Sequence, residues 1–386
     1  MNFLRRLPTL RLFLFLGALL AAGAAAAAIA VTATSGTGGP PPAEPLAQAV
    51  HDAIGAGAPE GVSARVVFSN KLLPSSDLFG NFSSALLSGA SGRLWLTNDG
   101  HGRIELQSDA GDTQIVWDSA TLSVYDASSN TAYKVTLPQS SAPDTTTASP
   151  GPTLDQISSA LTNLAAHANV SDANPDVAAA QPAYTVSVSP KANGGLFGDA
   201  QLTWAAANGV PLRLAITAKG DSSPVLELKV TDISFGAVAS SDVAIPPPAG
   251  AKVVDLSAPA SSSGADSTDT PVTGINAVRA AVTFPLTAPA SVGDLSLSSA
   301  RLVGKGALLT YGDGLGALVV HENAAGAGGL PSALGALPKV SLGSISAREL
   351  QTPLGTVLSF DSGGVSFVVG GSMTNTDAEA AAKAFA

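Results

Sequence analysis

Bulky apolar residues alternate with small or polar ones in four consecutive segments between residues 183 and 256. In Leu226-Glu227-Leu228-Lys229, for example, apolar and charged side chains strictly alternate. Because neighbouring side chains point to opposite faces of a strand, each segment would have one apolar and one polar face. Turn sequences rich in asparagine and glycine separate the segments. The pattern predicts an antiparallel meander with strands at 184–189, 200–205, 212–218 and 225–235.

The residues before this meander predict more strands of the same kind. Turn sequences separate most of them, and we expect strands at 62–69, 92–97, 103–108, 113–118, 121–126 and 131–137. The apolar face of such a sheet must be covered. The cover can be a packed core, or it can be a lid over a cavity that holds an apolar ligand.

Two insertions interrupt the strands and have helical spacing of apolar residues. In residues 74–88 the apolar residues, which include Phe79, Phe82 and Leu86, would form one stripe. In residues 153–168 the apolar residues, Leu161 among them, recur at helical intervals, and Thr153 is a candidate N-cap. A shorter amphipathic helix is expected at 45–54. The two inserted helices are the candidates for a lid over the sheet.

The chain begins with Arg5, Arg6 and Arg11, followed by an uninterrupted apolar run at residues 12–31. A run of this length can cross a membrane as a helix, and the arginines would keep its N-terminus in the cytoplasm. A cleaved secretory signal is the alternative, because the later half of the run is rich in alanine. Both interpretations place the rest of the chain outside the cytoplasm, either anchored to the cell membrane by a single span or secreted.

A segment without apolar periodicity, 257–272, separates a smaller unit from the first one. Strands in this unit are expected at 294–303, 307–311, 317–322, 344–350, 353–360 and 364–369, with a short helix at 332–337. A last helix, 377–385, would be capped by Thr376 or Asp377. We expect five parts: an anchor or signal peptide at 1–34, a linker at 35–45, a first domain at 46–256, a linker at 257–272, and a small α+β domain at 273–386.

Composition excludes several functions. The net charge of −10 argues against a general nucleic-acid binder, and the absence of cysteine rules out disulfides, thiolate metal sites and a lipid-modified cysteine. The four histidines are scattered, so no metal site is expected. The glycine-rich stretch 312–316 lacks the context of a phosphate loop and predicts a hairpin turn, and no serine lies in a Gly-x-Ser-x-Gly motif. We expect neither catalysis nor a cofactor.

Three stretches resemble the closing pattern of the LolA-like superfamily, which includes lipoprotein carriers and the periplasmic sigma-E regulator RseB. They are Val210-Pro211-Leu212-Arg213, Val230-Thr231-Asp232-Ile233-Ser234-Phe235-Gly236 and Ile245-Pro246-Pro247-Pro248-Ala249-Gly250. The second unit is similar to the small C-terminal domain of actinobacterial members. The resemblance implies an α+β fold, in which an open antiparallel half-barrel of about eleven strands with a helical lid encloses a hydrophobic cavity for acyl chains.

The resemblance leaves three functions open: a carrier of lipid or lipoprotein, a regulator that controls a membrane partner such as an anti-sigma factor, and a structural envelope protein without a ligand. The arginine in the cavity of the classical carrier cannot be placed here by any motif, and Arg65 and Arg93 are interpreted as ordinary strand residues.

Aromatic residues are scarce, so those on predicted strands are candidates for a cavity lining, although core packing would use them equally well. The sequence does not decide on which face of its strand Trp95 lies, because Leu94 and Leu96 compete with it for the inner face. The residues that we expect to line the cavity or form its lid are Phe68, Phe79, Phe82, Leu86, Trp95, Trp117, Leu161 and Trp204.

Overall fold

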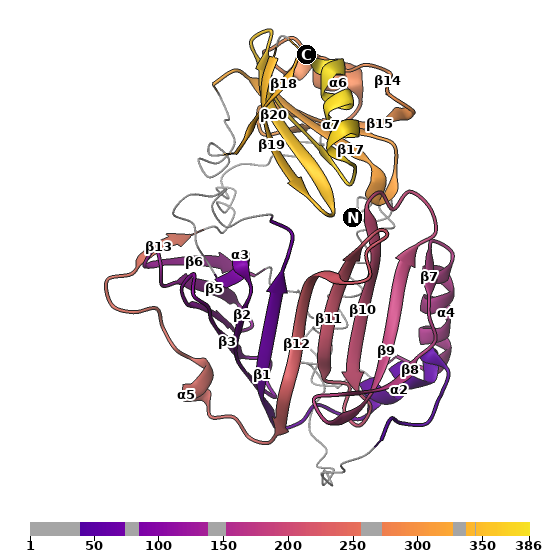
Figure 1. Cartoon of the computed structure of the whole chain (residues 1–386), viewed down its shortest axis with the longest axis vertical. Coiled ribbons are helices and arrows are strands. Elements are labelled where there is room, and N and C mark those ends of the chain that lie inside the picture. Colours follow the sequence, from indigo (N-terminus) through magenta and orange to yellow (C-terminus); the bar gives the residue numbers. More distant parts are fainter. Residues whose placement is uncertain (1–38, 74–84, 138–151, 256–271, 327–336, 344) are drawn as a thin grey trace, which may run out of the picture.

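The computed structural model describes residues 39–73, 85–137, 152–255, 272–326, 337–343 and 345–386, and its strands form two separate sheets (Figure 1). The large sheet has thirteen strands in the order β13-β6-β5-β4-β3-β2-β1-β12-β11-β10-β9-β7, with β8 beside β9. Its two end strands, β13 and β7, do not pair with each other, so the sheet is not closed. The open, mostly antiparallel sheet agrees with the expected fold class, whereas the expected number of strands was too low.

The strands of the large sheet are β1 (Gly61–Asn70), β2 (Ala90–Thr97), β3 (Gly102–Gln107), β4 (Thr113–Trp117), β5 (Thr121–Asp126), β6 (Thr131–Thr136), β7 (Ala168–Val170), β8 (Asn174–Ala178), β9 (Gln181–Pro190), β10 (Phe197–Ala205), β11 (Pro211–Ala218), β12 (Pro224–Phe235) and β13 (Lys252–Asp255). The predicted meander is confirmed as β9 to β12, which pair antiparallel in chain order. At the turn before β11, Gly209 has a φ of +68°, a conformation that favours glycine.

Three strands of this sheet were not predicted, namely β7, β8 and β13. Strand β7 has three residues, and β8 contains Pro175, which is rare inside strands. Strand β13 pairs with β6 in parallel, although every other pair in the sheet is antiparallel. These strands lie at or beside the two edges of the sheet, where alternation of apolar and polar residues is not needed.

Register defines the two faces of the large sheet. Residues directly opposite each other on neighbouring strands have their side chains on the same face. Phe68 lies opposite Leu228, and Leu228 lies opposite Leu214, so this row belongs to one face, the apolar face. Arg65 lies opposite Arg93 on the other, polar face.

Helices cover one part of the apolar face. Helix α2 (Leu46–Gly55) buries Ala49 against Trp204 and Tyr184 of β10 and β9. Helix α4 (Leu154–Ala165) contacts α2, and the two lie at the β7–β9 end of the sheet (Figure 1). The predicted cap of α4 is confirmed, because the Thr153 hydroxyl accepts a hydrogen bond from the Gln156 backbone N–H and the Gln156 side chain accepts one from the Thr153 N–H.

The second sheet has eight strands in the order β14-β15-β16-β17-β21-β20-β19-β18. They are β14 (Ser291–Val292), β15 (Leu295–Val303), β16 (Gly306–Tyr311), β17 (Leu318–Ala324), β18 (Lys339–Leu342), β19 (Ile345–Thr352), β20 (Gly355–Ser362) and β21 (Val365–Gly371). Helices α6 (Ile275–Ala281) and α7 (Asn375–Ala382) contribute to the core of this sheet. The cap of α7 is Thr374 rather than Thr376 or Asp377, because the Thr374 hydroxyl accepts the Asp377 backbone N–H.

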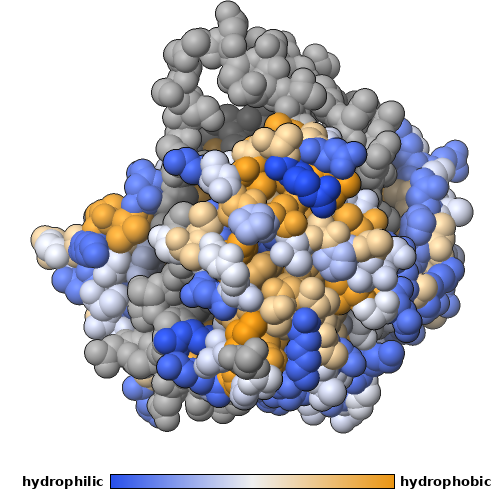
Figure 2. Space-filling model, turned by 90° about the horizontal axis from the view of Figure 1, so that it is seen from above, coloured by the Kyte–Doolittle hydropathy of each residue, from blue (hydrophilic) through white to orange (hydrophobic). Residues whose placement is uncertain are grey.

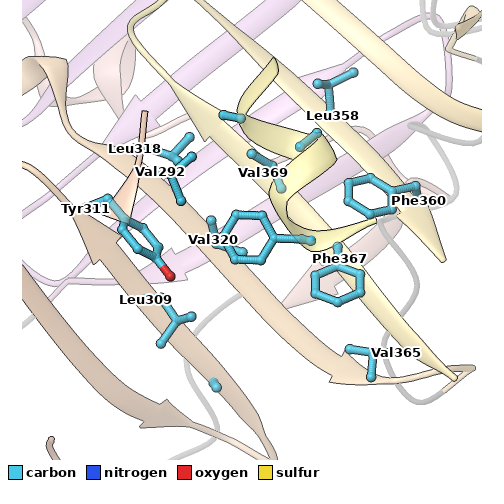
Figure 3. Packing of buried hydrophobic residues seen from close by; sticks show 14 of the residues in the cluster. Val292, Leu309, Tyr311, Leu318, Val320, Leu358, Phe360, Val365, Phe367 and Val369 are labelled. Atoms are coloured by element: carbon cyan, nitrogen blue, oxygen red, sulfur yellow. The ribbon is translucent and has the colours of Figure 1, made fainter. Parts of the chain in front are cut away.

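The core of the second sheet is dense and aromatic (Figure 3). Phe360 stacks on Phe367 with ring centroids 5.1 Å apart. The Phe385 ring packs edge-to-face with Tyr311 at 5.9 Å and is tilted against Phe367 at 6.0 Å. Phe367 is 1% exposed. Seen from the end of the molecule at which this sheet lies, hydrophobic residues occupy the centre of the surface and hydrophilic ones its flanks (Figure 2).

Loops join the two sheets through backbone hydrogen bonds. The Asn193 carbonyl, between β9 and β10, accepts the Gly316 N–H at 2.6 Å, and the Ser372 carbonyl accepts the Leu196 N–H at 3.2 Å. Gly195 has a φ of +58° and a Cβ there would collide with the Ser372 carbonyl oxygen. The glycine-rich stretch 312–316 is confirmed as the connection between β16 and β17, and it forms part of this junction.

Several predicted features lie outside the described residues: the anchor at 1–34, most of the helix at 74–88, most of the linker at 257–272 and most of the helix at 332–337. The domain boundaries therefore stay predictions. Within the described ranges, no helix combines the length and the apolar character that a membrane crossing requires.

Candidate functional site

The middle of the large sheet has an apolar face that the described helices leave half-exposed, and we call it the central apolar face. It is formed by side chains of five neighbouring strands: Phe68 of β1, Leu94 and Leu96 of β2, Ile104 of β3, Leu214 and Ile216 of β11, and Leu226 and Leu228 of β12. Each of these side chains is neither fully buried nor fully exposed. Val62, Val66 and Val230 lie on the same face but are buried, so the accessible apolar surface consists of the half-exposed members.

The register of the strands aligns the side chains of the central apolar face in rows across the sheet. One row runs from Ala90 through Phe68 and Leu228 to Leu214. The next row toward the end of β1 pairs Leu226 with Ile216. Three members, Leu214, Ile216 and Leu226, pack against none of the clusters of buried residues in the described part of the chain. An apolar ligand that lies along these rows would remove their remaining accessible apolar surface from water.

The last turn of the predicted lid helix is described, and it is fixed to the edge of this face. This turn is helix α3 (Ala85–Ser88), in which Ala85 is completely buried. The Asn70 side chain at the end of β1 donates to the Leu86 carbonyl at 2.8 Å and accepts the Leu72 N–H at 2.9 Å. After α3, Gly89 turns the chain with a φ of +89° close to the Phe68 carbonyl. Helix α3, at the end of the segment predicted to form the lid, is thus positioned by β1.

Half-exposed apolar side chains continue from the central apolar face toward β6. Trp117 of β4 lies opposite Gly102 of β3 on the same face as Leu96. A Cβ at Gly102 would collide with the Trp117 ring, so the missing side chain provides the space for the indole. The sequence analysis singled out Trp117 but not Gly102, and only the pairing of β3 with β4 connects the two residues.

The structure separates the predicted cavity residues into distinct places. Phe68, Leu86 and Trp117 lie on or at the edge of the apolar face. Leu161 is half-buried on α4. Phe79 and Phe82 lie outside the described residues.

Two of the predicted tryptophans lie away from the central apolar face. Trp95 is on the polar face, where the Arg103 guanidinium lies 4.8 Å from its ring centroid, whereas Leu94 and Leu96 take the apolar face. Trp204 is on the apolar face but beneath α2, where it is 2% exposed. Its ring centroid lies 6.0 Å from that of Tyr184, so Trp204 is a core residue in this arrangement.

A hollow of about 340 Å³ lies at the end of the two central strands. Lys71, which follows β1, donates its backbone N–H to the Val225 carbonyl of β12 at 2.7 Å. The hollow is lined by Lys71, Asp221, Ser222, Ser223, Pro224 and Val225 of the large-sheet region and by Pro353 between β19 and β20. The hollow adjoins the ends of β1 and β12, and its lining includes the charged residues Lys71 and Asp221. Sequence reasoning missed the hollow because its lining comes from three separate loops.

The polar face of β9 to β12 carries a network of side chains that satisfy one another. Arg213 donates to Glu227 at 2.5 Å and to Gln201 at 2.7 Å. Burial acts to raise the pKa of Asp199, but hydrogen bonds donated by Thr217, Ser187 and Gln201 hold the pKa of this carboxyl below its usual range. The polar side chains of this part of the sheet therefore satisfy one another's hydrogen bonds and need no external partner.

Comparisons with known proteins give likenesses of structure. No known family pattern matches the sequence, and no curated protein sequence is significantly similar to it. A crystal structure of MucB in complex with MucA(peri) has 15% identity and a TM-score of 0.42, with 87% of this chain and 97% of that chain covered. The Pseudomonas aeruginosa MucA/MucB complex has 19% identity and a TM-score of 0.38, with 87% and 94% covered.

A third solved structure is a putative outer membrane lipoprotein-sorting protein domain from Vibrio parahaemolyticus. It has 9% identity and a TM-score of 0.24, and the alignment covers 51% of this chain and 95% of that chain. Each of these three structures is less than 20% identical to this chain and has a TM-score below 0.5.

Proposed function

We propose that this chain is a membrane-tethered extracytoplasmic protein that holds acyl chains of a lipid or lipoprotein against its central apolar face. One observation carries the proposal: the eight side chains of the central apolar face are half-exposed, whereas Trp204 and Tyr184 of the same sheet face are buried beside α2. Apolar surface of this kind gains roughly 25 cal/mol for each Å² that a ligand removes from water. Binding would need no catalytic group.

The dimensions of the site suit one hydrocarbon chain. The row of half-exposed side chains from Ala90 through Phe68 and Leu228 to Leu214 crosses three strand spacings, which is about 14 Å. An acyl chain in one leaflet spans about half of the ~30 Å hydrocarbon core, or about 15 Å. The hollow beside Lys71, at the ends of β1 and β12, would receive the polar part of an amphipathic ligand.

The tether is proposed from sequence alone. The apolar run at 12–31 is long enough to span a bilayer, and the three arginines before it favour a cytoplasmic N-terminus. A carrier fixed to one membrane would hand its ligand over or hold it locally, because it cannot diffuse freely. Control of a membrane partner such as an anti-sigma factor stays a prediction.

Lipid analysis of the purified full chain tests the proposal directly. The protein would be extracted in mild detergent, washed, and examined by native mass spectrometry and by extraction of bound lipid. We expect co-purifying phospholipid or another acylated molecule and uptake of a fluorescent fatty acid by the emptied protein. A protein that carries no lipid and takes up no fatty acid would leave only the structural interpretation.

A variant on the central apolar face locates the binding. Leu214→Asn places an amide on β11 at a half-exposed position outside the buried clusters, so the fold should persist. Fatty-acid affinity should fall about tenfold, because the loss of one buried leucine contact is worth about 1.5 kcal/mol or more. Val319→Asn, at a 38% exposed valine of the second sheet, is the matched control and should leave affinity unchanged.

A further inference from the structure

We propose that three exposed cations on the polar face of the large sheet, Arg93, Arg65 and Lys229, bind an extended acidic segment of another protein. We call these three residues the basic strip. They lie on the neighbouring strands β2, β1 and β12: Arg65 is directly opposite Arg93, and Lys229 is directly opposite Val67, two residues further along β1. All three are exposed. The basic strip is on the face opposite to the proposed lipid site, so the two interactions are independent.

Two of the charged neighbours of the basic strip are already paired with other residues. Glu105 forms an ion pair with Arg103, and Glu227 forms one with Arg213. Asp232 is the register partner of Arg65, yet the two form no ion pair. None of the three cations makes an ion pair with a described residue. The strip is therefore a local positive surface on a chain whose net charge is −10.

The arrangement of the two arginines has a cost that a bound anion would remove. Like charges directly opposite each other on neighbouring strands destabilise a sheet. Their Cβ atoms lie about 5 Å apart at such a pair, so the two guanidinium groups can reach the same carboxylate or two adjacent ones. Arginine binds carboxylates with two parallel hydrogen bonds, which suits this geometry.

The same face already holds a polypeptide segment that crosses the strands, and this favours a peptide partner. Residues 240–250, which include helix α5 (Ser240–Val243), run from β2 and β3 toward β6. The Arg103 side chain of β3 donates to the Asp242 carbonyl at 3.0 Å, and the Gln114 side chain of β4 donates to the Ile245 carbonyl at 3.4 Å. Side chains of this face thus hold the backbone of a segment that runs across it.

A second segment could cross the sheet on the other side of α5, over β2, β1 and β12. From β2 to β12 is two strand spacings, or about 10 Å, and Lys229 lies two residues, or about 7 Å, further along, so the diagonal from Arg93 to Lys229 is about 12 Å. Carboxylates four positions apart lie on the same side of an extended chain at about 13 Å, so they would meet Arg93 and Lys229, with Arg65 between them. Val67, 37% exposed within the strip, would give such a segment an apolar contact. A flat anionic bilayer fits less well, because it would face a wider area of this acidic chain than a narrow segment would.

Peptide binding to the full chain tests the proposal. The probe is a fluorescent synthetic peptide rich in aspartate and glutamate, followed by anisotropy, and its neutral counterpart has asparagine and glutamine instead. We expect binding of the acidic peptide that weakens with salt. The double variant Arg65→Glu/Arg93→Glu should weaken it by about tenfold or more, since two charge contacts become repulsive.

Matched variants keep the result independent of folding. Arg65→Lys/Arg93→Lys retains the charge and should lose only part of the affinity, because a lysine cannot bind bidentately. Asp232→Asn removes the carboxylate beside the strip and should strengthen binding. Lys305→Glu, an exposed lysine between β15 and β16, is the control for net charge and should leave binding unchanged.

Three outcomes would overturn the proposal. The first is equal binding of the acidic and the neutral peptide. The second is unchanged binding by Arg65→Glu/Arg93→Glu while Lys305→Glu weakens it. The third is binding of the full chain through the strip to phosphatidylglycerol vesicles but not to the acidic peptide, which would make the basic strip a membrane contact. Fatty-acid uptake is measured in parallel and should not change in these variants.

Discussion

The core of the second sheet and the central apolar face of the large sheet arise from the same alternating pattern, yet they differ in burial. Phe367, Leu309 and Val320 are at most 1% exposed, and α7 and Phe385 contribute to the same cluster. On the large sheet, Phe68 and Leu228 remain half-exposed, and α2 and α4 lie at one end of the sheet. Alternation therefore predicts an apolar face, but the placement of helices decides whether that face becomes a closed core or accessible surface.

Truncation of a phenylalanine in each region should give the largest difference. Phe367→Ala should reduce the stability of the second sheet by about 3–5 kcal/mol, because it leaves a cavity in a closed core. Phe68→Ala should cost about 1–2 kcal/mol, because the ring is already partly in contact with water. Hydrogen exchange of peptides from β21 and β1 of the full chain measures both effects. Equal losses would mean that the two regions are packed alike.

The pH dependence of stability should distinguish the two sheets next. Glu322 of β17 is completely buried, and burial raises its pKa from 4.5 to about 7, although the Thr287 N–H donated to its Oε2 acts in the other direction. The folded state therefore keeps the proton to a higher pH than the unfolded state. Stability should be highest below pH 4.5, should fall by about 3 kcal/mol as pH rises to about 7, and should then stay level.

Hydrogen exchange of β16 and β17 at several pH values would measure this slope. Glu322→Gln removes this titration and should flatten the slope. An unchanged slope in Glu322→Gln would assign the dependence to another group. The buried Glu349 of β19 is the competitor, since burial and Glu379 raise its pKa as well.

The smallest effect concerns the helix that covers the packed end of the large sheet. Thr153→Ala removes the capping box of α4 and should destabilise that helix by about 1 kcal/mol. Thr162→Ala in the same helix is the control, and it should be neutral or slightly stabilising because alanine has the higher helix propensity. Local exchange rates in α4 would report both. A larger loss in Thr162→Ala would show that the cap does not limit the stability of this helix.

Sequence reasoning recovered most strands and helices because alternation and helical spacing are strong in them. It missed β13 and β8, where the pairing is parallel or includes a proline. The face of Trp95 could not be predicted, because Leu94, Trp95 and Leu96 are all large and apolar, and the pairing of β2 with β1 decides between them. The space that Gly102 leaves for Trp117 depends in the same way on a neighbouring strand.

The sequence predicted that the sheet has an apolar face, but it did not predict which side chains of that face remain accessible. An apolar sheet face with an inserted helix beside it followed from the pattern of the chain, and the end of that helix is fixed by Asn70. Burial of Trp204 beneath α2 could not be inferred, since α2 is distant from β10 in sequence and its docking is a tertiary contact. Long-range contacts of this kind leave no local signal in a single sequence.

The three tryptophans of this chain occupy three different surroundings, and this gives the protein its own optical reporter. Trp204 is enclosed beneath α2, Trp95 is beside a guanidinium on the polar face, and Trp117 is half-exposed on the apolar face. A hydrocarbon guest near β4 would shift the emission of Trp117 to shorter wavelength, whereas a peptide on the other side of the sheet would change the emission of Trp95. Single-tryptophan variants would therefore reveal from fluorescence alone which face has been occupied.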